Sequence, residues 1–69
     1  MNNKKKEVEI TGDLIYPITV GESAFIREAG GMRRTSTVLS MENSSQSDIR
    51  FETQNTNYLL HLVEQEVAV

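Results

Sequence analysis

Residues 33–63 read RRTSTVLSMENSSQSDIRFETQNTNYLLHLV, and this stretch decides the fold. It contains three β-strand patterns separated by two polar turns. The middle pattern, residues 49–53, alternates apolar and polar side chains, which is typical of a half-buried strand. The flanking runs, residues 35–41 and 58–63, are rich in β-branched and apolar side chains, which suit a pleated sheet. We therefore predict a three-stranded meander, because three strands with an apolar face can hold where a lone hairpin is marginal.

The N-terminal half adds shorter strand patterns that could close a small sheet. Residues 7–11 alternate strictly and predict a strand. Gly12-Asp13 is compatible with a turn before a second strand over residues 14–20, or with a bulge inside one long strand. Pro17 cannot donate to a ladder, so it predicts an edge position or a bend. Residues 23–27 predict a further short strand.

Together these patterns predict an all-β fold of five to six short strands, arranged as a small antiparallel barrel or sandwich. An SH3-like barrel is the nearest common architecture. Gly30-Gly31 predicts a hairpin turn, because glycine adopts positive φ freely. Residues 1–6 are expected to be a disordered basic lead-in, and residues 7–69 a single β domain. Residues 64–69 could extend the last strand, fray, or belong to a helix that starts near Tyr58.

The composition limits the chemistry of the chain. The 69 residues include no cysteine, which excludes disulfides, thiolate zinc sites and cysteine nucleophiles, and one histidine, which argues against a histidine-built metal site. A chain of this size buries only about 60% of its unfolded surface. Natural chains this short often self-associate to gain stability, so we predict a homo-oligomer. No metal or other cofactor is expected.

The charge pattern argues against two classes of partner. Residues 1–50 hold seven basic and seven acidic side chains, residues 51–69 hold three acidic ones, and the net charge is −3. This balance does not suit non-specific nucleic-acid binding through the overall field. No apolar run approaches the roughly 18–20 residues of a membrane span, and no apolar segment of a secretory signal follows the basic start. We expect a cytoplasmic protein with no membrane association.

The basic residues Arg33 and Arg34, which open a hydroxyl-rich strand, are the most suggestive short motif. With Arg50 they form a candidate site for a nucleotide, a nucleic-acid backbone or another anion, because guanidinium groups bind phosphate and carboxylate in a bidentate manner. The alternative is that the arginines pair with acidic side chains on neighbouring strands, with Glu22, Glu28 and Glu52 as candidates.

The apolar residues predict a second candidate surface. Tyr16, Phe51 and Tyr58 fall on faces predicted to be buried, whereas Phe25 lies opposite the buried Ala24 and Ile26 and would mark an interface if exposed. Strand pairing with a partner is the other route, because an edge strand carries unpaired backbone groups. The predicted interface residues are Phe25, Leu59, Val67 and Val69.

Catalysis is not expected. His61 is the one side chain whose unperturbed pKa lies near neutral pH, and no particular Ser or carboxylate can be assigned to it. We interpret it as an exposed strand histidine. A core this small also rarely provides a concave site that excludes water.

Four segments carry a resemblance to known proteins: residues 12–18 (GDLIYPI), 20–22 (VGE), 34–38 (RTSTV) and 51–58 (FETQNTNY). In them the chain resembles short uncharacterised proteins of Gram-positive bacteria and their phages or conjugative elements. The resemblance implies a bacterial accessory protein and transfers no catalytic or binding residue. We therefore predict a non-enzymatic interaction protein that docks to another protein or to itself. The alternative is a binder of nucleic acid or a phosphorylated ligand.

Overall fold

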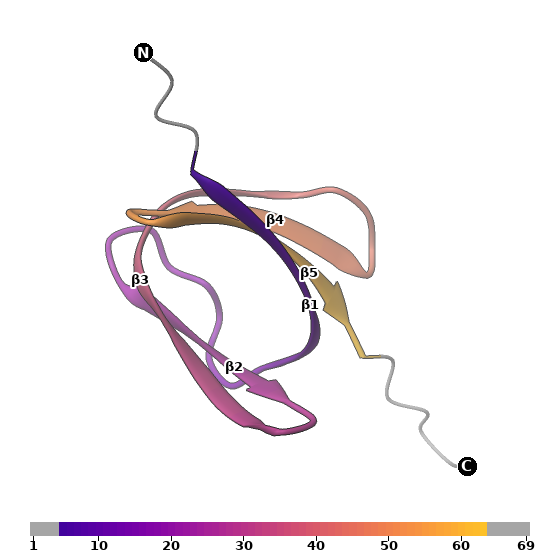
Figure 1. The fold of residues 1–69 in the computed structure, drawn as a ribbon. Helices are drawn as coiled ribbons and strands as arrows, with labels where there is room; N and C mark the ends of the chain where they lie inside the picture. The colour runs from indigo at the N-terminus through magenta and orange to yellow at the C-terminus, as the bar shows by residue number, and fades with distance from the viewer. Residues whose placement is uncertain (1–4, 64–69) are drawn as a thin grey trace, which may run out of the picture.

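The computed structural model describes residues 5–63 and is all-β. In chain order the strands are β1 (Lys6–Leu14), β2 (Ser23–Glu28), β3 (Gly31–Asn43), β4 (Asp48–Thr53) and β5 (Thr56–Leu62). They form a closed barrel in this order (Figure 1). The predicted small all-β barrel is therefore confirmed. No helix long and apolar enough to cross a membrane occurs in residues 5–63.

The barrel closes through a parallel pair. Each of the four connections reverses the chain direction, so β5 runs in the same direction as β1. Their pairing extends from Lys6 opposite Thr56 to Gly12 opposite Leu62, whereas the other four pairs are antiparallel. An odd number of strands in a closed meander requires one such parallel pair, so the barrel is antiparallel except at this closing pair.

Gly12 lies where β1 passes from one half of the barrel to the other. Up to Gly12 the strand pairs with β5, and at Asp13 and Leu14 it pairs with β2. A Cβ atom added at Gly12 would lie 2.3 Å from the carbonyl oxygen of Arg27. Only glycine allows the two backbones to come this close. Of the two interpretations of Gly12-Asp13, the single long strand is right, with a close backbone approach in place of a bulge.

The predicted second strand over residues 14–20 is wrong. Residues 15–22 form an irregular connection, in which Gly21 has a φ of 97°. Pro17 has no N–H to donate, which disfavours a ladder at this point. Tyr16, which the alternation placed on a buried face, is instead 63% exposed.

Two irregularities in pairing let β3 pass between the sheets. Its register shifts against β2 beside Ala24 and against β4 after Val38. Extra residues in a strand reset the period-two alternation. As a result Thr35 and Val38 are both buried although they lie three positions apart. Leu39 and Met41, which strict alternation places on the face of Thr35, are exposed.

Two buried threonines supply hydrogen bonds where the ladders are interrupted. Thr35 Oγ1 accepts a hydrogen bond from the Ala24 N–H at 3.0 Å and donates to the Ser36 carbonyl at 2.7 Å. Thr53 Oγ1 accepts from the Thr56 N–H and donates to the Thr56 carbonyl, both at 3.1 Å. A buried backbone group without a partner costs about 1–3 kcal/mol, so these hydroxyls stabilise the bulge and the β4–β5 turn.

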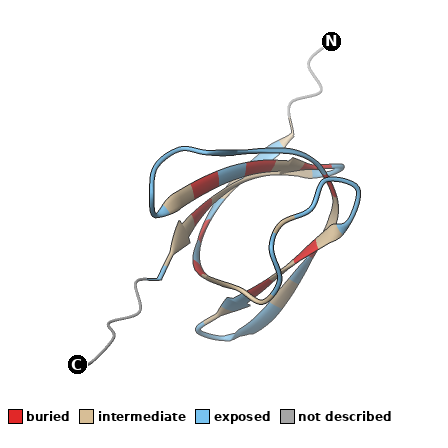
Figure 2. Ribbon diagram, turned by 180° about the vertical axis from the view of Figure 1, so that it is seen from behind, coloured by how far each residue is buried: buried red, intermediate tan, exposed pale blue. Residues whose placement is uncertain are grey.

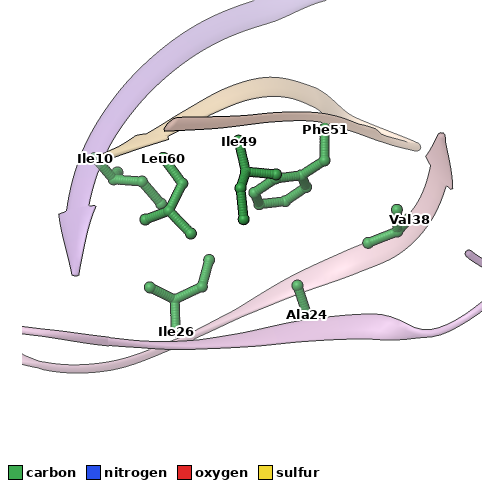
Figure 3. Packing of buried hydrophobic residues seen from close by; sticks show 7 residues of the cluster. All are labelled: Ile10, Ala24, Ile26, Val38, Ile49, Phe51 and Leu60. Carbon is green, nitrogen blue, oxygen red and sulfur yellow. The ribbon is translucent and has the colours of Figure 1, made fainter. Parts of the chain in front are cut away.

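The core lies between the two halves of the barrel. Side chains from β1, β4 and β5 point toward side chains from β2 and β3 (Figure 3). The cluster consists of Ile10, Ala24, Ile26, Val38, Ile49, Phe51 and Leu60. The predicted core positions Phe51 and Tyr58 stack with ring centroids 4.9 Å apart. Exposed residues cover the β3–β4 turn and the outer sides of the strands (Figure 2).

The boundary of the predicted lead-in needs correction. β1 begins at Lys6, and the Lys5 ammonium group donates to the Glu52 carboxylate and, at 2.7 Å, to the Thr53 carbonyl. The lead-in predicted over residues 1–6 is therefore too long by two residues, because cross-strand contacts hold Lys5 and Lys6 in the barrel. Its remaining part, residues 1–4, lies outside the described residues.

Candidate functional site

A partly exposed aromatic pair, the exposed Tyr16 and the half-buried Phe25, lies on the outer side of β2 and β3. Phe25 points away from the core, as predicted, and the Tyr16 ring meets it edge to face, with centroids 5.9 Å apart and an interplanar angle of 84°. The Ile15 N–H donates to the Phe25 carbonyl at 3.1 Å, which holds the connection after β1 beside β2. This hydrogen bond positions Tyr16 against Phe25, although the two residues belong to different elements.

Two arginines and a methionine flank the aromatic pair. Arg34 lies opposite Phe25 in the β2–β3 ladder, with its guanidinium carbon 6.0 Å from the ring centroid, which is within range of a cation–π interaction. Arg27 lies opposite Met32, which is 65% exposed. We call this surface the aromatic face and define it as Tyr16, Phe25, Arg27, Met32 and Arg34. Within residues 5–63, neither Arg27 nor Arg34 forms a salt bridge.

The predicted anion site is not assembled. Arg33 and Arg34 are consecutive in β3 and therefore point to opposite sides of the strand. Arg33 Nε donates to the Glu28 carboxylate, which raises the pKa of Arg33. Arg50 is exposed on β4, in the opposite half of the barrel. Pairing with Glu28, one of the alternatives considered from the sequence, is thus the role of Arg33.

The sequence reasoning missed three members of the aromatic face: Tyr16, Arg27 and Met32, which lies opposite Arg27. Arg27 follows Phe25 by two positions in the same strand, so the alternation that placed Phe25 outside also places Arg27 outside. The alternation of β2 was therefore sufficient to predict that Arg27 lies beside Phe25. Tyr16 could not be found in this way, because it belongs to an irregular segment whose path depends on Pro17 and on the hydrogen bond to β2.

The other predicted interface residues do not form an edge. Leu59 lies in β5, which pairs with β1 at Glu9 and with β4 at Arg50. Both sides of its backbone are occupied by ladder partners, so Leu59 cannot add a partner strand, and that part of the prediction is wrong. Val67 and Val69 lie outside the described residues.

A second surface lies on the opposite side of the barrel, over β1, β5, β4 and the second half of β3. We call it the acidic face and define it as Glu7, Glu9, Glu42, Glu52, Arg50 and Leu59. These residues line an open depression of about 600 Å³. Val8 and Phe51 also contribute to the lining, but their row of side chains points into the barrel. The residues of the acidic face belong to the rows on either side of it, which point outward. The depression therefore lies on the outer side of the sheet. It combines four carboxylates with one guanidinium around an aliphatic side chain.

His61 joins three strands at the margin of the acidic face. Its Nδ1 lies 2.8 Å from Asp48 Oδ1 on β4, and its Nε2 is hydrogen-bonded to the Glu9 carboxylate on β1. The hydrogen bonds to Glu9 and then to Asp48 raise the pKa of His61, with a smaller opposing effect of desolvation. The histidine is therefore a half-buried cross-strand link rather than the exposed strand histidine that we inferred from the sequence.

This cluster does not form a metal site. The two nitrogens of an imidazole ring point in divergent directions, so Glu9 and Asp48 lie on opposite sides of the His61 ring and cannot converge with it on one ion. No group of three or more His, Asp or Glu side chains within residues 5–63 could hold a metal ion.

A scan against protein-family models and searches of curated proteins and of solved structures each gave no match. The resemblance to short proteins of Gram-positive bacteria and their mobile elements accordingly stays a prediction.

Proposed function

We propose that this protein is a non-enzymatic interaction module that docks to another protein or to a second copy of itself through the aromatic face. The observation that carries the proposal is the edge-to-face pair of the exposed Tyr16 and the half-buried Phe25, beside the exposed Arg27 and Arg34. Tyr, Phe, Met and Arg are enriched at protein interfaces, and Tyr and Arg dominate binding energy when they become buried. The resemblance noted in the sequence adds a bacterial or mobile-element accessory role to the proposal.

The alternative route to a partner, strand pairing, receives less support. Every strand has ladder partners on both sides over part of its length, because the barrel is closed. Among the described residues, positions 40–43 of β3 have ladder partners only in β4, and positions 6–12 of β1 only in β5. The β3 edge carries Glu42 and the β1 edge carries Lys6, Glu7 and Glu9, and charged side chains on an edge strand discourage pairing. The aromatic pair with its exposed Tyr16 is the better-supported docking element.

A photo-crosslinking experiment tests the proposal. A benzophenone side chain placed at position 16 should give one predominant crosslinked product in extracts of the source cell. An excess of unlabelled protein should compete for that product, and an excess of the Phe25→Asp variant should not. The Gln46→Asp variant, which adds the same charge in the exposed β3–β4 turn outside both faces, serves as the matched control and should compete normally. Equal competition by the Phe25→Asp variant would exclude the aromatic face as the docking surface.

Binding of single-stranded nucleic acid or a phosphorylated ligand is the second candidate function. The observation in its favour is Arg34 over the Phe25 ring beside the exposed Tyr16, because bases stack on aromatic rings while arginines neutralise phosphates. For two phosphate contacts, a plot of log affinity against log salt should have a slope of about −1.4. Fluorescence anisotropy with a labelled oligonucleotide measures this slope. Replacing Arg27 and Arg34 with Ala should abolish binding, whereas Arg50→Ala should not; equal effects would refute this candidate.

A further inference from the structure

The protein carries two surfaces of complementary charge and shape on opposite sides of one small barrel. We infer that the aromatic face of one copy docks into the acidic depression of the next, so that the chain assembles head to tail. This inference rests on the proposed function, because it names the partner of the aromatic face. It commits to a second copy of this chain as that partner.

Charge complementarity is the first argument. The aromatic face presents Arg27 and Arg34, and the one carboxylate beside them is Asp13, opposite Arg27 in the β1–β2 ladder. The acidic face presents four carboxylates around Arg50; Glu52 is bonded to Lys5 and Glu9 to His61, which leaves Glu7 and Glu42 without a salt bridge in residues 5–63. Each face therefore has an excess of one sign, and the two signs are opposite. Copies brought together through these faces would neutralise charges that a single chain leaves unpaired.

Shape is the second argument. The acidic depression is about 600 Å³, within the range of cavities that hold organic ligands. Leu59 provides an apolar floor between the glutamates. Tyr16, 63% exposed, and the half-buried Phe25 form the apolar part of the aromatic face, with Arg34 over the Phe25 ring. An aromatic pair seated on Leu59 would place Arg27 and Arg34 near the glutamate rim, where unlike charges meet.

The placement of the two faces fixes the kind of assembly. The outer sides of the two sheets lie on opposite sides of the core, as Figure 3 shows from the inward side chains. A contact between two different faces is heterologous, so it leaves one free face at each end and does not stop at a dimer unless it closes into a ring. We therefore expect a mass that grows with protein concentration. High salt should disperse the assembly, because the rim contacts between charges are screened.

A charge-swap experiment tests the inference. One variant carries Arg27→Glu and Arg34→Glu and is acidic on both faces. The other carries Glu7→Lys and Glu42→Lys, both exposed positions without a salt bridge among the described residues, and is basic at the rim of the depression. Sedimentation velocity at low salt should show that each variant alone is monomeric and that an equimolar mixture assembles. Roughly 1 M salt, where the Debye length is about 3 Å, should disperse the mixture.

Recovery on mixing is the decisive result, because a folding defect in either variant cannot be corrected by the other. A mixture that stays monomeric, or a single variant that assembles like the unmodified chain, overturns the inference. If the unmodified chain is monomeric at low salt while position 16 crosslinks to a different protein, head-to-tail assembly fails and the proposed docking function stands. If position 16 crosslinks only within the acidic face of another copy, both are supported.

Discussion

Charged side chains on and around the acidic face are joined across strands, whereas the arginines of the aromatic face are not. Lys5 bonds to Glu52, and His61 lies between Glu9 and Asp48. Exposed ion pairs contribute roughly 0–1 kcal/mol each, so these links do more to hold neighbouring strands together than to set total stability. The Glu9–His61 link spans the parallel β1–β5 pair that closes the barrel, and the Asp48–His61 link joins β4 to β5.

The aromatic face has no comparable set of links. Arg34 lies over Phe25, and Arg27 has Asp13 as its ladder neighbour without a salt bridge in the described part of the chain. The acidic face thus joins part of its charge across strands and leaves Glu7, Glu42 and Arg50 without a salt bridge in residues 5–63, whereas the aromatic face leaves both of its arginines without one. The comparison teaches that the position of a charged residue relative to its neighbouring strands, rather than its presence in the sequence, decides whether it forms an internal ion pair.

The largest expected loss of stability follows substitution of Gly12, where β1 passes from one half of the barrel to the other. Gly12→Ala should lower the free energy of unfolding by about 3 kcal/mol or more, because the added methyl group meets the rigid Arg27 backbone. Chemical denaturation measures the loss. Gly30→Ala is the control, because a Cβ atom at Gly30 meets nothing within 4 Å. Similar stability of the two variants would contradict the close approach of β1 to β2.

A smaller loss of stability is expected when the hydroxyl group of either buried threonine, Thr35 or Thr53, is removed. Thr35→Val and Thr53→Val should each cost about 1–3 kcal/mol, because each leaves buried backbone groups without their hydroxyl partner. Thr→Ser at the same positions keeps the hydroxyl and should cost less than Thr→Val. If valine proves no worse than serine at either position, the hydroxyl hydrogen bonds are not what stabilises that interruption of the ladder.

The His61 link predicts a pH dependence that the aromatic face lacks. The neighbouring carboxylates raise the pKa of His61 above its ordinary value of 6.5, so the folded state binds the proton more tightly than the unfolded state. This contribution to stability is fully present below about pH 6.5 and is lost as the pH rises through the raised pKa. Urea unfolding across this range should show the decline, and His61→Gln should remove it. A decline of the same size in His61→Gln would assign it to other groups.

The smallest expected effect is on stability at the aromatic face. Tyr16→Ser should change the free energy of unfolding by less than about 1 kcal/mol, because Tyr16 is largely exposed and contributes mainly one edge-to-face contact. The same variant should lose docking in the crosslinking competition. A large loss of stability would mean that the aromatic pair is a structural element of the barrel rather than a binding surface.

The sequence predicts the alternating parts of the fold and fails at its irregularities. Residues 49–53 alternate cleanly, and the structure has β4 there. The period-two rule also places Phe25 outside. It fails in β3, where extra residues bury both Thr35 and Val38, because a bulge arises from pairing with two different strands rather than from local sequence.

The candidate site was only partly predictable for the same reason. Arg33 and Arg34 are consecutive and Arg50 is the same type of residue on a nearby predicted strand. The alternation of side chains separates the first two, and Arg50 lies in the other half of the barrel. Contacts such as that of Tyr16 with Phe25 depend on how a loop packs against a strand, and no periodicity in the sequence encodes that packing.

Docking of the aromatic face of one copy against the acidic face of another can be tested most directly by amide NMR spectra recorded as the protein is concentrated at low salt. We predict shifts that cluster around Phe25 and Arg34 on one side and around Glu42 and Arg50 on the other, and that vanish at high salt. Spectra that do not depend on concentration, or shifts confined to the edge of β3, would contradict the account.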